Sequence, residues 1–243
     1  MKAVILSAGQ GRRLLPLTKE VPKCALQIEG RSLVEWQIDE LLKSGFRDVT
    51  TVLGFRAEAV ERLLADHYHP GQVQALYNPF YSICDNLVSC WMARPRMTED
   101  FLLLNGDTLF ETAVLARLLG SPSRPVTLAT DCKAAYDADD MKVTLDGNKV
   151  VRVGKTLTPE QSHRESIGMI LFRDDGPALF AAALERALRE PHALKQWYLS
   201  VIDEMAKTGL VWECSMQGLQ WIEVDCYPDL MQARKLIAGR NDE

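Results

Sequence analysis

The sequence has no long hydrophobic run and no paired cysteines. The apolar stretch near the N-terminus is about six residues long, whereas a secretion signal needs roughly 7–15 and a membrane span about 18 or more. We therefore expect a buried strand there and no membrane association. The six cysteines are scattered without a C-x-x-C pair, and a chain of this length needs no disulfide framework. Reduced thiols and a cytoplasmic location are the expectation.

Positive charge is not in excess either. The chain has 28 Lys and Arg residues against 33 Asp and Glu residues, a formal net charge of -5. A protein that neutralises a nucleic-acid backbone needs the opposite balance, so we expect no nucleic-acid partner and only local phosphate chemistry. His67 and His69 lie in a polar turn without a nearby cysteine pair, which favours a structural or solvent-facing role over zinc binding.

The hydrophobic pattern predicts an α/β fold with one continuous mixed sheet. In residues 1–120, short apolar segments alternate with helical ones, which implies parallel strands. Strands are expected at 2–7, 48–53, 73–77 and 101–104, and helices from 32, 57 and 113. Beyond residue 120 the pattern is more antiparallel, with a hairpin turn at 146–148. There we expect strands at 126–130, 141–145, 150–153, 167–172, 211–214 and 221–224, helices at 178–189 and 195–207, and a final helix.

A glycine turn follows the first predicted strand. Gly9 and Gly11 flank one residue, but Leu14 stands where a dinucleotide-binding fingerprint needs a third glycine, and the G-K-[ST] ending of a P-loop is absent. Both of those sites are excluded. What remains is a loop of exposed N–H groups that can approach phosphate, with Arg13 and Lys23 supplying positive charge. An ordinary turn with solvated basic residues stays open.

Two aspartates follow predicted strands. Asp107 comes after the apolar run 101–104, and Asp225 comes after 221–224. Carboxylates at strand ends can hold Mg²⁺. Each aspartate could instead cap a helix or a turn, and Glu223 competes with Asp225 for the same role.

The glycine turn is part of a longer motif, Ala8-Gly9-Gln10-Gly11-Arg12-Arg13-Leu14-Leu15-Pro16-Leu17-Thr18 followed by Val21-Pro22-Lys23. This stretch resembles the signature of the sugar-phosphate nucleotidyltransferase superfamily, as do Leu102-x-x-x-Gly106-Asp107 and Trp221-x-x-x-Asp225. The resemblance implies a Rossmann-like three-layer α/β/α domain over residues 1–243 with a mixed, mainly parallel sheet and an antiparallel subregion. Residues 1–120 would mainly bind the nucleotide and 121–243 the acceptor.

The resemblance also implies the roles of particular residues. Ala8, Gly9, Gly11 and Arg13 would hold a triphosphate, Lys23 would contact phosphates during transfer, and Asp107 and Asp225 would bind Mg²⁺, with Asp107 also beside the nucleotide.

Residues 77–91 point to a narrower branch. They are similar to the N-N-x-x-S pattern of bacterial phosphocholine cytidylyltransferase-like enzymes, which implies that Asn86 and Ser89 lie by the base and sugar of CTP. The alternative is that Asn86 caps a helix that contains Ser89.

The acceptor residues are less sharply defined. Lys155 aligns loosely with the lysine that this superfamily uses for the acceptor phosphate, and Lys142 is a second candidate. Glu165 and Trp197 could receive an ammonium group through charge and cation–π contact, although core packing of Trp197 is the favoured explanation. Phosphocholine, an aminoalkyl phosphonate, a polyol phosphate or a sugar phosphate all remain as acceptors. So do a sugar-1-phosphate uridylyl-, guanylyl- or thymidylyltransferase, a catalytically silent nucleotide-binding domain, and a homodimer as the assembly.

Overall fold

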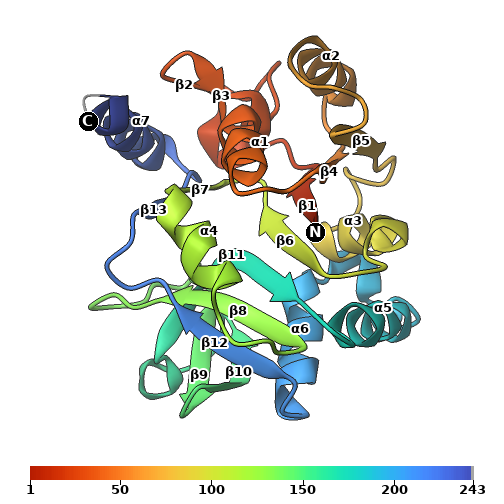
Figure 1. The fold of residues 1–243 in the computed structure, drawn as a ribbon, viewed down its shortest axis with the longest axis vertical. Coiled ribbons are helices and arrows are strands. Elements are labelled where there is room, and N and C mark those ends of the chain that lie inside the picture. Colours follow the sequence, from red (N-terminus) through yellow and green to blue (C-terminus); the bar gives the residue numbers. More distant parts are fainter. Residues whose placement is uncertain (242–243) are drawn as a thin grey trace.

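The computed structural model describes residues 1–241, and its centre is one nine-stranded sheet (Figure 1). The strand order is β5-β4-β1-β6-β11-β8-β12-β10-β9, and β13-β7 and β2-β3 form two small separate sheets. The strands are β1 Lys2–Ser7, β2 Gln27–Ile28, β3 Arg31–Ser32, β4 Asp48–Leu53, β5 Val73–Tyr77, β6 Phe101–Asn105, β7 Thr108–Phe110, β8 Val126–Asp131, β9 Lys142–Asp146, β10 Lys149–Gly154, β11 Arg164–Phe172, β12 Val211–Ser215 and β13 Trp221–Glu223. The helices are α1 Leu33–Lys43, α2 Ala57–His67, α3 Asn86–Met92, α4 Thr112–Leu119, α5 Gly176–Ala187, α6 Tyr198–Lys207 and α7 Tyr227–Asn241.

Strand direction changes along the sheet. β1 pairs in parallel with β4 and β6, and β4 with β5, as the alternation of strands and helices predicts. β11 then runs antiparallel to β6 and β8, and β9 and β10 form an antiparallel hairpin. β12 returns parallel to β8. The predicted mixed sheet is confirmed, and it is continuous across the two predicted halves.

Helices cover both faces of the sheet, which gives the predicted three layers. α1, α2 and α4 pack on one face, and α3, α5 and α6 pack on the other (Figure 1). Each face has its own core: the first lies under α1, α2 and α4, and the second under α3, α5 and α6. In β6, Leu102 and Leu104 belong to the first core and Phe101 and Leu103 to the second, because successive strand residues point to opposite faces. The apolar run at 101–104 is therefore a strand buried on both sides.

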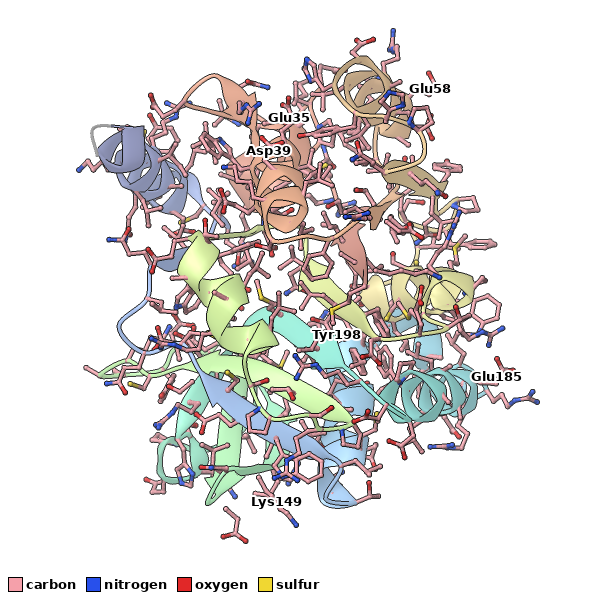
Figure 2. All side chains as sticks on the ribbon, in the orientation of Figure 1. Glu35, Asp39, Glu58, Lys149, Glu185 and Tyr198 are labelled. Carbon is pink, nitrogen blue, oxygen red and sulfur yellow. The ribbon has the colours of Figure 1, made fainter. Side chains whose placement is uncertain are left out.

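The second core contains three stacked phenylalanine rings. The ring of Phe172 lies 4.5 Å from that of Phe101 and 4.4 Å from that of Phe180, measured between centroids. Tyr198 lies fully buried in the same core, in the interior of the view in Figure 2, whereas Glu58 and Glu185 lie near its edge.

In a third, smaller core, α7 and β13 pack against the region that follows the glycine loop. Apolar residues from the N-terminal region, from β7 and from the C-terminal segment meet in it: Leu14, Leu26, Ile28, Leu33, Leu109, Ile222, Val224, Leu230, Ala233 and Ile237. The C-terminal segment is thereby packed beside the N-terminal motif.

Helix starts differ from their predictions by up to three residues, and α6 differs most. The helix expected from Lys195 begins at Tyr198, because Ala193–Lys195 forms a separate 3-10 turn and Trp197 is an extended cap residue. In the described part of the chain, none of the helices has the length and apolarity that a membrane crossing requires. The six cysteines all have free thiols.

Candidate active site

Two short strands bring together aspartates that are distant in the sequence. β7 and β13 pair antiparallel, with Glu223 opposite Thr108. The main-chain N–H of Val224 donates to the carbonyl oxygen of Asp107 at 2.9 Å. Because Asp107 directly precedes β7 and Asp225 comes shortly after β13, this pairing places both aspartates beside the carboxyl end of β6.

The side chain of Lys23 joins the two aspartates. Its Nζ lies 2.8 Å from Asp107 Oδ2 and 2.6 Å from Asp225 Oδ1, and its side chain is 13% exposed. Burial alone would lower the pKa of Lys23, but the two carboxylates outweigh it, and the pKa is raised above its ordinary value. Burial likewise opposes ionisation of Asp225, yet Lys23 and then Arg13 hold its pKa below the usual value. Lys23 and Asp225 are therefore both charged at neutral pH.

Arg13 and Glu223 complete the charge cluster. The guanidinium of Arg13 contacts Asp225 Oδ2 at 2.9 Å and Asp139 Oδ2 at 3.0 Å. Burial, with Asp107 and Asp225 nearby, raises the pKa of Glu223 to about 8, so this carboxyl is largely protonated at neutral pH. In this structure the ammonium of Lys23 and the guanidinium of Arg13 are thus both paired with carboxylates.

Two glycines let the main chain approach this cluster closely. Gly11 has a φ of 76°, and a Cβ there would lie 2.7 Å from the Cβ of Lys23. A Cβ on Gly106 would lie 2.1 Å from the Oγ of Ser7. The hydroxyl of Thr18 donates to the carbonyl oxygen of Gly11 at 2.8 Å and fastens the loop. A side chain at either glycine would displace the lysine or the turn that precedes Asp107.

A cavity of about 400 Å³ opens against the glycine loop, a size usual for small-molecule sites. The predicted nucleotide-site residues all line it: Ala8, Gly9, Gly11, Arg13, Lys23, Asn86, Ser89 and Asp107. A larger hollow of about 650 Å³ lies between α5 and α6, but its lining contains none of the predicted site residues.

Asn86 and Ser89 reach the cavity from α3. Asp85 is the cap residue and Asn86 is the first residue of the helix, so the alternative with Asn86 as the N-cap is wrong by one position. The Oδ1 of Asn86 instead accepts the main-chain N–H of Tyr198 at 3.0 Å. The Oγ of Ser89 accepts from the side-chain amide of Asn78 at 2.9 Å. Both side chains are therefore held in place by neighbouring elements.

A second cavity of about 150 Å³ shares the wall formed by Arg13 and Asp107 and also contains Lys155 and Trp197. The Nζ of Lys155 lies 4.6 Å from the centroid of the Trp197 ring. Trp197 is 43% exposed, so the expectation that it packs in the core is wrong. The neighbouring Tyr198, which opens α6, takes the buried position, and its hydroxyl donates to Asn105 Oδ1 at 2.9 Å.

Lys142 and Glu165 line neither of these cavities. The ammonium of Lys142 donates to the main-chain carbonyl of Lys155 at 2.8 Å. Glu165 pairs with Lys133 at 3.0 Å and borders a separate shallow hollow beside α7. The predicted direct contacts of these two residues with an acceptor are not supported, because their side chains are turned onto neighbouring main chain and onto Lys133.

Asp139 has no sequence signal that identifies it, although it contacts both Arg13 and Lys155, the latter at 3.7 Å. It lies in the loop between β8 and β9, where closely spaced acidic residues are typical of a solvated turn. The main-chain N–H of Asp139 donates to Asp137 Oδ1 at 2.8 Å. Asn105, which lines the smaller cavity, is not among the predicted site residues either. Its position at the end of β6, two residues before Asp107, is the signal that could have identified it.

The two aspartates fit a magnesium ion. Asp107 Oδ1 is buried and has no hydrogen-bond partner among the described residues, so one oxygen is free to act as a ligand. Mg²⁺ prefers carboxylate oxygens and usually keeps water and substrate phosphates in its shell. Within residues 1–241 no group of three or more His, Cys, Asp or Glu side chains is arranged to hold a metal ion.

The family model described as nucleotidyl transferase matches residues 2–120. Over this part, which is just under half of its length, the chain is similar to the nucleotidyltransferase family. The matched part contains the glycine loop, Lys23, Asn86, Ser89 and Asp107, whereas Lys155, Trp197 and Asp225 lie beyond it.

Curated relatives match nearly the whole chain. It is 29% identical to the CMP-5'-(3-aminopropyl)phosphonate synthase of Streptomyces rubellomurinus, over 96% of this chain and 38% of that protein. It is 27% identical to the bifunctional IPC transferase and DIPP synthase of Aquifex aeolicus, over 97% of this chain and 51% of that protein. The chain thus spans about half the length of these relatives or less. The solved CTP:phosphocholine cytidylyltransferase of Streptococcus pneumoniae shares the fold, with a TM-score of 0.79, 19% identity and coverage of 97% and 98% of the two chains.

Proposed function

We propose that the chain transfers a CMP group from CTP to a small phosphorylated or phosphonate acceptor and releases pyrophosphate, with Mg²⁺ as cofactor. The observation on which this depends is the convergence of Lys23, Arg13, Asp107 and Asp225 beside one glycine-lined cavity. The names of the relatives supply the choice of CTP, since both a phosphonate CMP synthase and a phosphocholine cytidylyltransferase are among them.

The reaction is an in-line attack by an acceptor oxygen on the α-phosphorus of CTP. The bond to the bridging oxygen of pyrophosphate breaks as the new P–O bond forms, and negative charge grows on the leaving group. Lys23 and Arg13 offset that charge, since both face the cavity at the end of the glycine loop. Asp107 and Asp225 would hold Mg²⁺, which supplies further charge neutralisation on the phosphates when it is bound.

The smaller cavity is the place for the acceptor. Lys155 supplies a cation for its phosphate or phosphonate group, and Trp197 supplies an exposed ring for the rest of the molecule. Arg13 lines both cavities, so it can contact both reactants. A nucleophile that is held in line with the α-phosphorus reacts far faster than one that is free in solution.

The test is a pyrophosphate-release assay with CTP, UTP, GTP and dTTP against phosphocholine, 3-aminopropylphosphonate, inositol 1-phosphate and glucose 1-phosphate. Release that requires CTP, Mg²⁺ and one of the first three acceptors is the expected result. Turnover with UTP, GTP or dTTP and glucose 1-phosphate would replace the proposal with a sugar-1-phosphate nucleotidyltransferase. Nucleotide binding without any turnover would instead support a catalytically silent domain.

A further inference from the structure

We propose that Lys142 is a positioning residue that holds the main chain of Lys155 and thereby fixes the Lys155 ammonium against the Trp197 ring. The consequence for catalysis rests on the function proposed above. The structural part of the proposal does not, and it can be tested in the protein alone.

Lys142 is a buried lysine whose ammonium forms no ion pair with any described carboxylate. The residue is 6% exposed, and its Nζ donates only to main-chain carbonyls, that of Lys155 at 2.8 Å and that of Asp140 at 3.4 Å. Burying an ammonium without a counter-ion is unfavourable unless its hydrogen bonds are made. An apolar side chain would fill the same space at less cost, so those hydrogen bonds are what a lysine adds at this position.

The bond to Lys155 replaces a strand contact that is missing. The ladder between β9 and β10 ends where Lys142 lies opposite Gly154. Lys155 follows directly beyond that last pair, and in the described structure the ammonium of Lys142 is the donor to its carbonyl oxygen. Without this donor the carbonyl oxygen of Lys155 would lose this hydrogen bond, and the residue would keep only the contacts of its side chain with Asp139 and the Trp197 ring in addition to its neighbours in the chain.

Lys142 also contacts the main chain on the other side of the Lys155 contacts. The carbonyl of Asp140 accepts from the main-chain N–H of Lys142 at 3.1 Å and from its ammonium at 3.4 Å. Asp140 directly follows Asp139 in the loop before β9, and Asp139 lies 3.7 Å from the Lys155 ammonium. Lys142 thus fastens the main chain next to both members of this pair. Since Lys142 lines neither cavity of the candidate site, its influence on an acceptor passes through Lys155.

The first experiment measures where the Lys155 side chain lies. Protein labelled with ¹³C at lysine Cε is compared by NMR as wild type and as Lys155→Met, which assigns the Lys155 signal. The Trp197 ring shifts that signal upfield, and Trp197→Leu gives its position without the ring. Lys142→Met is expected to move the Lys155 signal most of the way to the Trp197→Leu position, whereas Lys142→Arg, which keeps a cationic donor, leaves it near the wild-type position.

An unchanged Lys155 signal in Lys142→Met would overturn the proposal. Thermal melting shows whether that variant is folded, and Lys142→Ala is measured in parallel so that a second truncation gives the same information. The proposal would also be wrong if the Lys155 signal moved as far in Lys142→Arg as in Lys142→Met, because both substitutions would then act through packing and not through the cationic donor.

The second experiment uses pyrophosphate release with CTP and phosphocholine as the probe acceptor. Lys142→Met is expected to raise the KM for phosphocholine about tenfold with little change in the KM for CTP. The double variant Lys142→Met, Lys155→Met should have a KM for phosphocholine no higher than that of Lys155→Met alone. If the free-energy effects of the two substitutions on the KM for phosphocholine were fully additive, Lys142 would act independently of Lys155 and the proposal would be wrong. If the wild type does not use phosphocholine, that result bears on the proposed function, and the NMR comparison still decides the role of Lys142.

Discussion

Replacing Lys23 by Met tests whether this ammonium and a divalent cation neutralise the same two aspartates. In the structure the ammonium lies between Asp107 and Asp225 at 2.8 Å and 2.6 Å. The variant leaves Asp107 without a cationic partner, while Asp225 keeps only its contact with Arg13 at 2.9 Å. We expect a loss of stability in metal-free buffer that Mg²⁺ partly reverses.

The size of the loss follows from the burial of the three groups. Removing one partner of a fully buried ion pair costs about 3–5 kcal/mol. Here the ammonium side chain is 13% exposed and the carboxylates 27% and 28%, so water weakens the effect to roughly 2 kcal/mol. For a chain of this size that corresponds to a fall in Tm of about 4–8 °C. If the variant binds Mg²⁺ with a Kd of about 1 mM, then ~10 mM MgCl₂ restores about 1.4 kcal/mol.

The assay is thermal melting with EDTA and with MgCl₂, and Lys207→Met is the matched control. Lys207 also contacts two carboxylates, Asp203 at 3.1 Å and Glu204 at 2.5 Å, but its side chain is 42% exposed. We therefore expect its Tm to fall by no more than about 2 °C and to be independent of Mg²⁺. Two results would refute the idea that ammonium and metal share one position. One is a Tm of Lys23→Met in EDTA equal to that of the wild type, and the other is an equal rise in the Tm of Lys23→Met and of Lys207→Met on addition of Mg²⁺.

Three further predictions concern the site and the core. Asp107→Asn and Asp225→Asn should each lower pyrophosphate release by about two orders of magnitude or more while the circular dichroism spectrum stays native, and near-normal turnover would remove the residue from the metal site. Glu223 has its pKa raised from 4.5 to about 8 in the folded protein, so the native state binds its proton more tightly and stability in metal-free buffer falls as the pH rises through that range. Glu223→Gln should flatten this dependence in urea unfolding. Phe180→Ala removes one ring of a fully buried stack and should cost about 3–5 kcal/mol in the same assay without changing the KM for CTP.

Local pattern predicted the elements whose burial is complete. The run at 101–104 is apolar because both faces of β6 are covered, and such a run can be recognised without knowing what covers it. The glycine loop and Lys23 could be found because the motif is contiguous. In each of these cases the information lies within a few neighbouring residues.

The remaining parts of the site depend on contacts that a local pattern does not encode. Asp107 and Asp225 meet because β7 and β13 pair over three residues each, and β7, unlike β13, is not among the predicted strands. The exposure of Trp197 depends on the exact start of α6, since one residue further along Tyr198 is fully buried. Asp139 reaches Arg13 across 126 positions of the chain, and nothing in its acidic loop distinguishes it from its neighbours.

The division into a nucleotide half and an acceptor half describes the order of the chain better than its chemistry. Residues 2–120 match the family model and contain Lys23 and Asp107, yet the second carboxylate on the Lys23 ammonium comes from Asp225. That aspartate is placed by β13 and by the third core, in which the C-terminal segment packs on residues from the N-terminal motif. An acceptor bound at Lys155 would lie against Arg13 and Asp225 in the same small cavity. Substitutions that change acceptor preference in residues 121–243 should therefore also alter the metal dependence of the reaction, because both properties involve the same few side chains.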